Sequence, residues 1–215
     1  MGSVLTVNAA AVPAGEHRLG SGIDKRPSAE PLAVRAPGPM RGGLGSGVVG
    51  DSIGNQRVHG GDDQAVYAYA REDLDAWQSR LQRELTNGMF GENLTTTGID
   101  INECLIGERW AIGADGLVLE VSRPRIPCST FATWLDVAGW VKTFTAAAVP
   151  GTYLRVIAPG TVRAGDAIEV CQRPSHTVTI GTVFRALTLE PGLLADLGAA
   201  EALPDDIKRQ AARRT

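Results

Sequence analysis

Short runs of apolar residues alternate with polar ones along much of the chain, and glycine or proline ends many of these runs. This period of two predicts strands rather than helices. The expected strands lie at residues 2–8, 30–38, 55–61, 108–113, 117–123, 151–160 and 167–173. Asp115-Gly116, between two of them, is a dipeptide that favours a tight hairpin. Many short strands separated by glycine turns are typical of a closed barrel.

Residues 71–85 follow a helical period instead, because their apolar side chains recur on one helical face. That face consists of Leu74, Trp77, Leu81 and Leu85. Asn87-Gly88 marks the end of this helix. We expect a less regular, partly helical segment over residues 130–148.

The pattern changes again at Thr177, after which three short helices are expected at residues 179–189, 191–200 and 204–214. Pro191 and Pro204 stand near the starts of two of them, where proline is preferred. The sequence therefore predicts a barrel domain over residues 1–176 and a small three-helix unit over residues 177–215. On this division, a chain cut after the barrel should still fold.

Composition supports a globular protein with many turns. The chain has 215 residues, of which 43% are hydrophobic and 21% charged, with 26 glycines and 12 prolines. This composition is globular rather than disordered, and the glycine and proline content agrees with many short strands. We expect a mainly β fold with helices, in the α+β class.

The net charge of −3 gives no overall electrostatic reason to bind nucleic acid or an acidic membrane. The basic end over residues 208–215 is explained by its place at the C-terminal end of a helix, whose dipole favours cations. No apolar run is long enough to cross a bilayer and no secretory leader is recognisable. We expect a cytoplasmic protein that binds neither nucleic acid nor membrane.

The three cysteines are widely spaced and odd in number, which favours neither a disulfide framework nor a C-x-x-C metal site. Cys104 and Cys171 lie in apolar strand-like runs and are expected in the core. Cys128 differs, because it follows an expected strand in the run PRIPC, with Arg123 and Arg125 close before it. It is either a small buried turn residue or a thiolate favoured by these cations and held at a pocket.

Three loops combine glycine with polar side chains: GIDKRP at residues 22–27, HGGDDQ at 59–64 and FGEN at 90–93. Each is either a self-satisfied turn or a place where backbone amides approach a ligand closely. GSGVVG at residues 45–50 matches G-x-G-x-x-G, but it lacks the strand before and the helix after that a dinucleotide site requires. We interpret it as a flexible turn.

In their order and rough spacing, GIDKRP, HGGDDQAVYAYAREDLDAW, FGENLTTTGID, IGERW and PRIPC resemble the MOSC domain family, named for the C-terminal domain of molybdenum cofactor sulfurase, and within it the YiiM-like group. The resemblance covers nearly the whole chain and is weak only in the helical tail. It implies a closed β-barrel followed by a three-helix unit, and a pocket for the molybdenum cofactor (molybdopterin). The family is also associated with pyridoxal phosphate binding.

The resemblance implies that Cys128 ligates molybdenum or carries sulfur, and that HGG and FGEN line the pocket. Lys25, Arg26 and Arg125 are expected to bind the cofactor phosphate, although Arg26 fits a solvated barrel rim equally well. The residues expected to bind the cofactor are Lys25, Arg26, His59, Gly60, Gly61, Gln64, Phe90, Gly91, Glu92, Asn93, Leu94, Arg125 and Cys128. Those expected in catalysis are Cys128 and, as a proton donor, Glu92.

The leading hypothesis from the resemblance is a reductase of N-hydroxylated compounds such as hydroxylamines and N-hydroxylated purines. No iron–sulfur ligand set or flavin fingerprint is visible, so electrons are expected from a separate donor protein. A sulfur or cofactor carrier that uses a persulfide of Cys128 is the alternative. A binding module without chemistry ranks last, because PRIPC and FGEN are intact. Oligomeric state stays open, with a homodimer one option.

Overall fold

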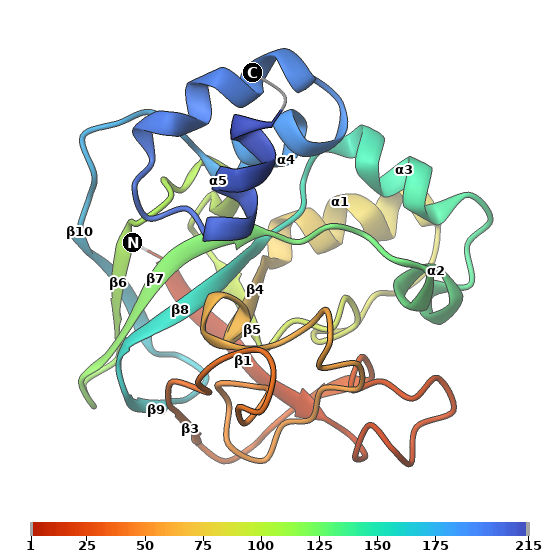
Figure 1. Cartoon of the computed structure of the whole chain (residues 1–215). Helices are drawn as coiled ribbons and strands as arrows, with labels where there is room; N and C mark the ends of the chain where they lie inside the picture. Colours follow the sequence, from red (N-terminus) through yellow and green to blue (C-terminus); the bar gives the residue numbers. More distant parts are fainter. Residues whose placement is uncertain (1, 214–215) are drawn as a thin grey trace.

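The computed structural model describes residues 2–213, and in this part of the chain a barrel carries helices over one end and along one side (Figure 1). The strands are β1 (Gly2–Ala10), β2 (Lys25–Pro27), β3 (Leu32–Val34), β4 (Val66–Ala70), β5 (Leu94–Thr97), β6 (Arg109–Ile112), β7 (Leu117–Pro124), β8 (Thr152–Ala158), β9 (Gly160–Val162) and β10 (Ala167–Gln172). The α-helices are α1 (Arg71–Leu81), α2 (Ser129–Leu135), α3 (Trp140–Ala147), α4 (Ile180–Thr188) and α5 (Asp205–Ala212). Single 3₁₀ segments are η1 (Asp62–Gln64), η2 (Ile101–Glu103) and η3 (Pro191–Ala199).

The barrel closes because β1 pairs with β10 as well as with β5. Around it the order is β10, β6, β7, β8, β4, β5 and β1. The pairing of β4 with β5 is parallel, and every other pairing around the barrel is antiparallel. A parallel pair needs a long crossover, which α1 supplies. The expected closed barrel in an α+β fold is therefore confirmed.

The hairpin expected around Asp115-Gly116 is confirmed, with Ile112 opposite Leu117 where β6 turns into β7. The turn matters for the site because β7, which follows it, ends at Pro124. Pro124 is the first residue of PRIPC, and Cys128 is the last. The partly helical segment over 130–148 is also confirmed as α2 and α3.

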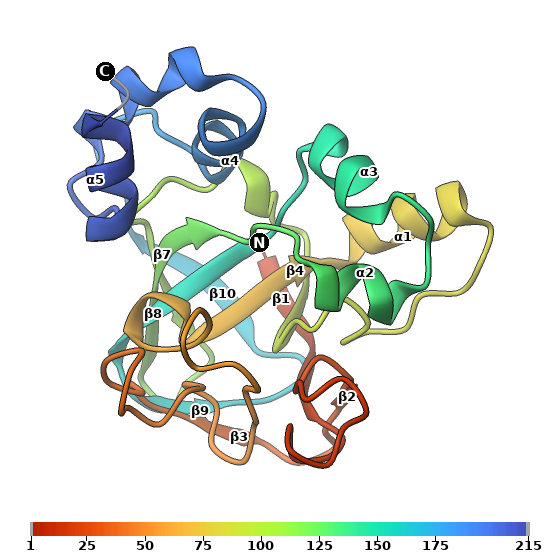
Figure 2. The same ribbon diagram turned by 45° about the vertical axis from the view of Figure 1, so that its right-hand side comes forward.

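The barrel core extends into the C-terminal helices. One hydrophobic cluster joins Val4 and Trp110 of the barrel to Ile180 and Val183 of α4 and Ile207 of α5. All five side chains are at most 1% exposed. In both Figure 1 and Figure 2, α4 and α5 lie together over one end of the barrel. The three helical segments exist as expected, but they share the core of the barrel, so a boundary at residue 177 does not separate two cores.

A second cluster lies outside the barrel and consists mainly of aromatic rings. It joins α1, α2 and α3 through Trp77, Phe90, Phe131, Trp140 and Phe144. The Phe90 and Phe131 rings pack edge to face with centroids 5.1 Å apart. Both residues lie beside segments that the sequence marks as pocket candidates, so this cluster gives the pocket a rigid outer support.

Two expected elements differ from the structure. Residues 55–61 form a turn rather than a strand, because Gly60 and Gly61 adopt φ values of +85° and +78°, which no regular strand allows. The helix predicted to reach Leu85 ends at Leu81, where Gln82 takes a left-handed conformation. Leu85 is nevertheless 1% exposed, because the following loop folds back and places it in the aromatic cluster.

The two cysteines expected in the core differ. Cys104 is 3% exposed, as predicted. Cys171 is exposed, and the prediction for it is wrong. Counted from buried Ile168, Cys171 falls on the outer face of β10 together with Glu169, and the end of this strand is exposed. Within residues 2–213 no helix has both the length and the apolar character needed to cross a bilayer.

Candidate functional site

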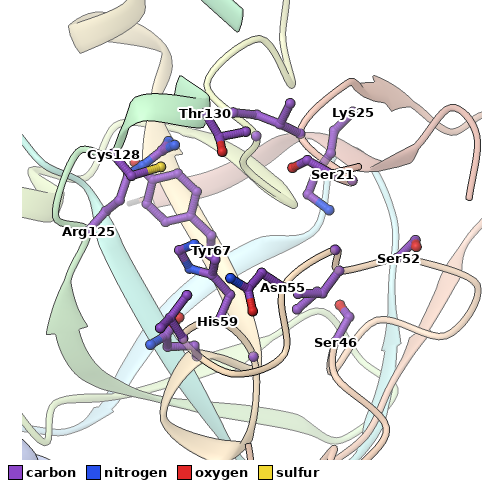
Figure 3. A pocket seen from close by; sticks show the side chains of 18 of the residues that line it. Ser21, Lys25, Ser46, Ser52, Asn55, His59, Tyr67, Arg125, Cys128 and Thr130 are labelled. Carbon is purple, nitrogen blue, oxygen red and sulfur yellow. The ribbon is translucent and has the colours of Figure 1, made fainter. Parts of the chain in front are cut away.

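A cavity of about 420 Å³ opens at the surface between three loops and the end of β7. Its walls come from residues 19–25, from 46–60 and from 125–130, with Phe90, Gly91 and Asn93 behind. Figure 3 shows Cys128, Arg125, Tyr67 and His59 on one side of this cavity and Ser21, Lys25, Ser46 and Ser52 on the other. The HGG, FGEN and PRIPC segments, which are distant in sequence, thus meet around one cavity.

Cys128 stands at the junction of β7 and α2, as the residue just before the helix, and its thiol is half-buried on the cavity wall. Partial burial is the strongest single influence and raises the pKa of the thiol. A hydrogen bond from His59, the backbone amide of Phe131 and the charge of Arg125 oppose it and lower the pKa from 9.0 to about 7. A large fraction of Cys128 is therefore thiolate at neutral pH.

Arg125 supplies a buried positive charge beside this thiol. Its side chain is enclosed by two rings, with the guanidinium carbon 3.7 Å from the Phe131 centroid and 5.3 Å from that of Tyr67. It donates a hydrogen bond to the carbonyl of Phe90, but within residues 2–213 no carboxylate pairs with it. A buried cation without an acidic partner favours an anion nearby, either the Cys128 thiolate or an anionic ligand.

His59 reaches the thiol because of the two glycines that follow it. A side chain at Gly60 would bring Cβ within 2.7 Å of the Gly45 carbonyl, and one at Gly61 would bring it within 2.6 Å of the Met40 backbone nitrogen. Both positions also have positive φ. The HGG turn can therefore pack against the 40–45 loop only with glycine there, and this packing fixes the imidazole at the cavity.

Glu92 is buried behind the cavity. Its carboxylate accepts hydrogen bonds from the amides of Gly88 and Phe90, at 2.6 and 3.0 Å, and from the Thr95 hydroxyl at 2.9 Å. Burial outweighs these bonds and raises its pKa. Since Glu92 is 0% exposed and is not part of the cavity wall, it holds the loop that carries Phe90. This placement does not support the expected role of direct proton donor.

Lys25 forms a buried ion pair with Asp51, with Nζ 2.5 Å from Oδ1. Asp51 also accepts hydrogen bonds from the Ser46 hydroxyl and the Asn93 side-chain amide, at 2.8 and 2.9 Å. Burial acts to raise the pKa of Asp51, but Lys25 and Asn93 lower it below its usual value. Lys25 is thus neutralised at the cavity wall, and it is a weaker phosphate partner than the sequence suggests.

Most of the expected site residues meet at this cavity. Those on its wall are Lys25, His59, Gly60, Gln64, Phe90, Gly91, Asn93, Arg125 and Cys128. Those away from its wall are Arg26, Gly61, Glu92 and Leu94. Arg26 points outward with 71% of its side chain exposed and pairs with Asp24, which agrees with the solvated-rim alternative. Arg123 pairs with Asp206 of α5 rather than supporting the thiolate.

The predictions from sequence missed Asp51, Tyr67 and Tyr153, although all three line the cavity. Asp51 follows a glycine in what looks like an ordinary turn, and the two tyrosines lie in apolar strand patterns typical of core residues. The one usable signal for Asp51 was its charge next to the GSGVVG loop. No group of three or more His, Cys, Asp or Glu side chains among residues 2–213 is placed to hold a metal ion.

The MOSC domain family model matches residues 55–169, more than half of the chain. YflK of Bacillus subtilis (strain 168) is 34% identical over 131 residues, 61% of this chain and 58% of that protein. YiiM of Escherichia coli (strain K12) is 33% identical over 134 residues, 60% of this chain and 58% of that protein. A protein of Gibberella moniliformis named Reductase is 28% identical over 205 residues, 82% of this chain but 36% of its own length. The chain thus spans less than two thirds of the curated relatives it matches.

Solved structures agree on the fold. The crystal structure of YiiM from Geobacillus stearothermophilus superposes with a TM-score of 0.78 at 24% identity, covering 100% of this chain and 99% of that one. The crystal structure of YiiM from Escherichia coli gives 0.74 at 21% identity, covering 100% and 92%. At these identities the likeness extends to the whole barrel with its C-terminal helices, and it concerns the fold alone.

Proposed function

Because the chain belongs to the MOSC domain family, we propose that it is an oxidoreductase that holds the molybdenum cofactor beside Cys128 and reduces N-hydroxylated compounds such as hydroxylamines and N-hydroxylated purines. The observation that carries this proposal is the half-buried Cys128 thiol, with its pKa lowered to about 7, next to the unpaired cation of Arg125. A relative named Reductase, matched over 82% of this chain, supports the reaction class.

The residues around the cavity fit such a cofactor. A thiolate is the soft ligand that a metal of this kind takes from a protein, and Cys128 offers it on the wall of a cavity of about 420 Å³. The anionic phosphate of the cofactor calls for a cation whose charge is not already neutralised. Arg125 meets that condition, whereas Lys25 is paired with Asp51 and Arg26 points away. We therefore assign ligation to Cys128 and charge balance to Arg125.

When bound, the cofactor supplies a centre that transfers two electrons to an N–O bond. Overall, a hydroxylamine takes up two electrons and two protons and yields the amine and water. The electrons come from a separate donor protein. Of the residues on the wall, His59 is the one suited to pass protons to the substrate, because its imidazole lies at the cavity beside Cys128. The aromatic enclosure of Arg125 keeps water away from that side of the cavity.

The test is the molybdenum content per folded monomer and the reduction of a hydroxylamine by a reduced artificial donor, with protein made in a host that produces the cofactor. Cys128→Ser should lose activity and retain little metal, because a hydroxyl of much higher pKa replaces a thiolate. Cys171→Ser, at an exposed position, is the matched control and should retain both. Arg125→Ala should bind less cofactor while remaining folded.

If Cys128→Ser keeps full metal content and full activity, the assignment of Cys128 is wrong. If the cofactor binds stoichiometrically and no N-hydroxylated compound in a broad panel is reduced, the reductase proposal is wrong. In that second case the same thiol fits a sulfur or cofactor carrier, which mass spectrometry would detect as a persulfide on Cys128.

A further inference from the structure

A second cavity, of about 620 Å³, lies where α5 meets the end of the barrel. Met40, Arg57 and Val58 form one side, and Leu203 to Asp206 with Arg209 form the other. An ion pair between Arg123 at the end of β7 and Asp206 of α5, at 2.9 Å, holds the two sides together. Figure 2 shows α5 standing beside the β7 end of the barrel. Of the residues expected to bind the cofactor, Gln64 is the one that also lines this cavity.

The charges in this second cavity leave two arginines without partners. Four arginines line it, at positions 57, 123, 155 and 209, together with three aspartates, at positions 63, 205 and 206. The aspartates are all engaged, since Asp63 pairs with Arg155, Asp206 with Arg123, and Asp205 with Lys208 at 4.0 Å. Within residues 2–213, no ion pair forms to Arg57 or Arg209. Two free guanidinium groups therefore remain at the mouth of the cavity.

Gln64 connects this second cavity to the one beside Cys128. Gln64 and Val58 line both cavities. The Gln64 side chain is 8% exposed, and its amide has no hydrogen-bond partner within the described part of the chain. Its amide atoms are not among the fully buried unsatisfied polar atoms of the described residues, so water in the cavities satisfies them. A ligand that spans the two cavities takes the place of this water as the hydrogen-bond partner of Gln64.

We propose that the second cavity binds the phosphate group of a substrate whose N-hydroxylated end lies in the cavity beside Cys128. A phosphate monoester carries close to two negative charges at neutral pH, which matches the two unpaired arginines, and guanidinium groups bind such oxygens two at a time. Gln64 then contacts the middle of the substrate. The reaction rests on the proposed function above, but the phosphate site does not, and it can be tested without the cofactor.

The first test is binding of adenosine 5′-monophosphate and of adenosine to cofactor-free protein, by isothermal titration calorimetry at low salt. Adenosine 5′-monophosphate should bind at least tenfold more tightly than adenosine. Arg57→Gln and Arg209→Gln should each weaken its binding about tenfold, as the loss of one charge-assisted hydrogen bond predicts. Adenosine binding should not change. Arg213→Gln, an exposed arginine at the end of the same helix, is the control and should behave as the starting protein.

The second test uses Gln64→Glu, which puts a negative charge between the two cavities and should weaken binding of the monophosphate more than binding of adenosine. If the monophosphate binds no more tightly than adenosine, or if its affinity depends on Arg125 and not on Arg57 and Arg209, the phosphate site is refuted. If the monophosphate binds through Arg57 and Arg209 but no N-hydroxylated compound is ever reduced, the phosphate site is supported and the proposed reaction is wrong. With active enzyme, Arg209→Gln should raise KM for a phosphorylated substrate and leave KM for its nucleoside unchanged.

Discussion

The reactivity of Cys128 can be predicted from the groups around its thiol. A pKa of about 7 instead of 9.0 means that about half of the thiol is ionised at pH 7 rather than about 1%, roughly a fiftyfold gain in thiolate. A thiolate of lower pKa is a weaker nucleophile, by about six- to tenfold over two pKa units. The net expectation is alkylation about five to eight times faster than for an ordinary thiol at pH 7, with an inflection near pH 7.

The assay is alkylation by iodoacetamide against pH, on cofactor-free protein in which exposed Cys171 is replaced by serine. Cys104 stays silent because it is buried and burial raises its pKa. His59→Ala removes a hydrogen bond to the thiolate, so the inflection should move up by about one to two pKa units. His176→Ala, a histidine away from the cavity wall, should leave it in place. An inflection above pH 8.5 before mutation, or one that His59→Ala does not move, would contradict the assignment.

Three further predictions concern folding and the support of the site. A chain ending at residue 176 should be largely unfolded by circular dichroism, since it lacks the fully buried Ile180 and Val183 of the shared core; a stable truncated barrel would refute this. Asp51→Ala should lower the free energy of unfolding in urea by about 3–5 kcal/mol, because it leaves a buried lysine unpaired; a loss below 1 kcal/mol would show that water reaches that lysine. Glu92→Gln should lose stability and activity together, whereas normal stability with lost activity would return Glu92 to the role of proton donor.

The elements with strong local signals were predictable. The β6–β7 hairpin has Asp-Gly at its turn, and the α1 segment keeps its apolar face for three turns. Neighbours in sequence therefore determine both elements. The turn at residues 55–61 could not be predicted, because its apolar and polar residues alternate as they do in a strand. Only its close packing against the 40–45 loop, far away in sequence, forces the positive φ of Gly60 and Gly61.

The same distinction applies to the site. The pocket segments were found because a family resemblance marks them, and nine of the expected residues do lie on the wall. Which charges are free there could not be read from the sequence. Asp51 neutralises Lys25 from 26 positions away, and Arg125 keeps its charge only because aromatic rings rather than carboxylates enclose it. Contacts between side chains so far apart in sequence depend on the fold, so no local sequence pattern predicts them.

The closure of the barrel through β1 and β10 affects how the protein folds during synthesis. β1 begins at Gly2 and its partner β10 ends at Gln172, so one edge of β1 lacks its partner until all the residues between them have been made. Contacts over such sequence distances make folding slow and leave strand edges exposed to other chains meanwhile. Since α4 and α5 also contribute to the core of the barrel, strands made early depend on helices that follow β10 in the chain.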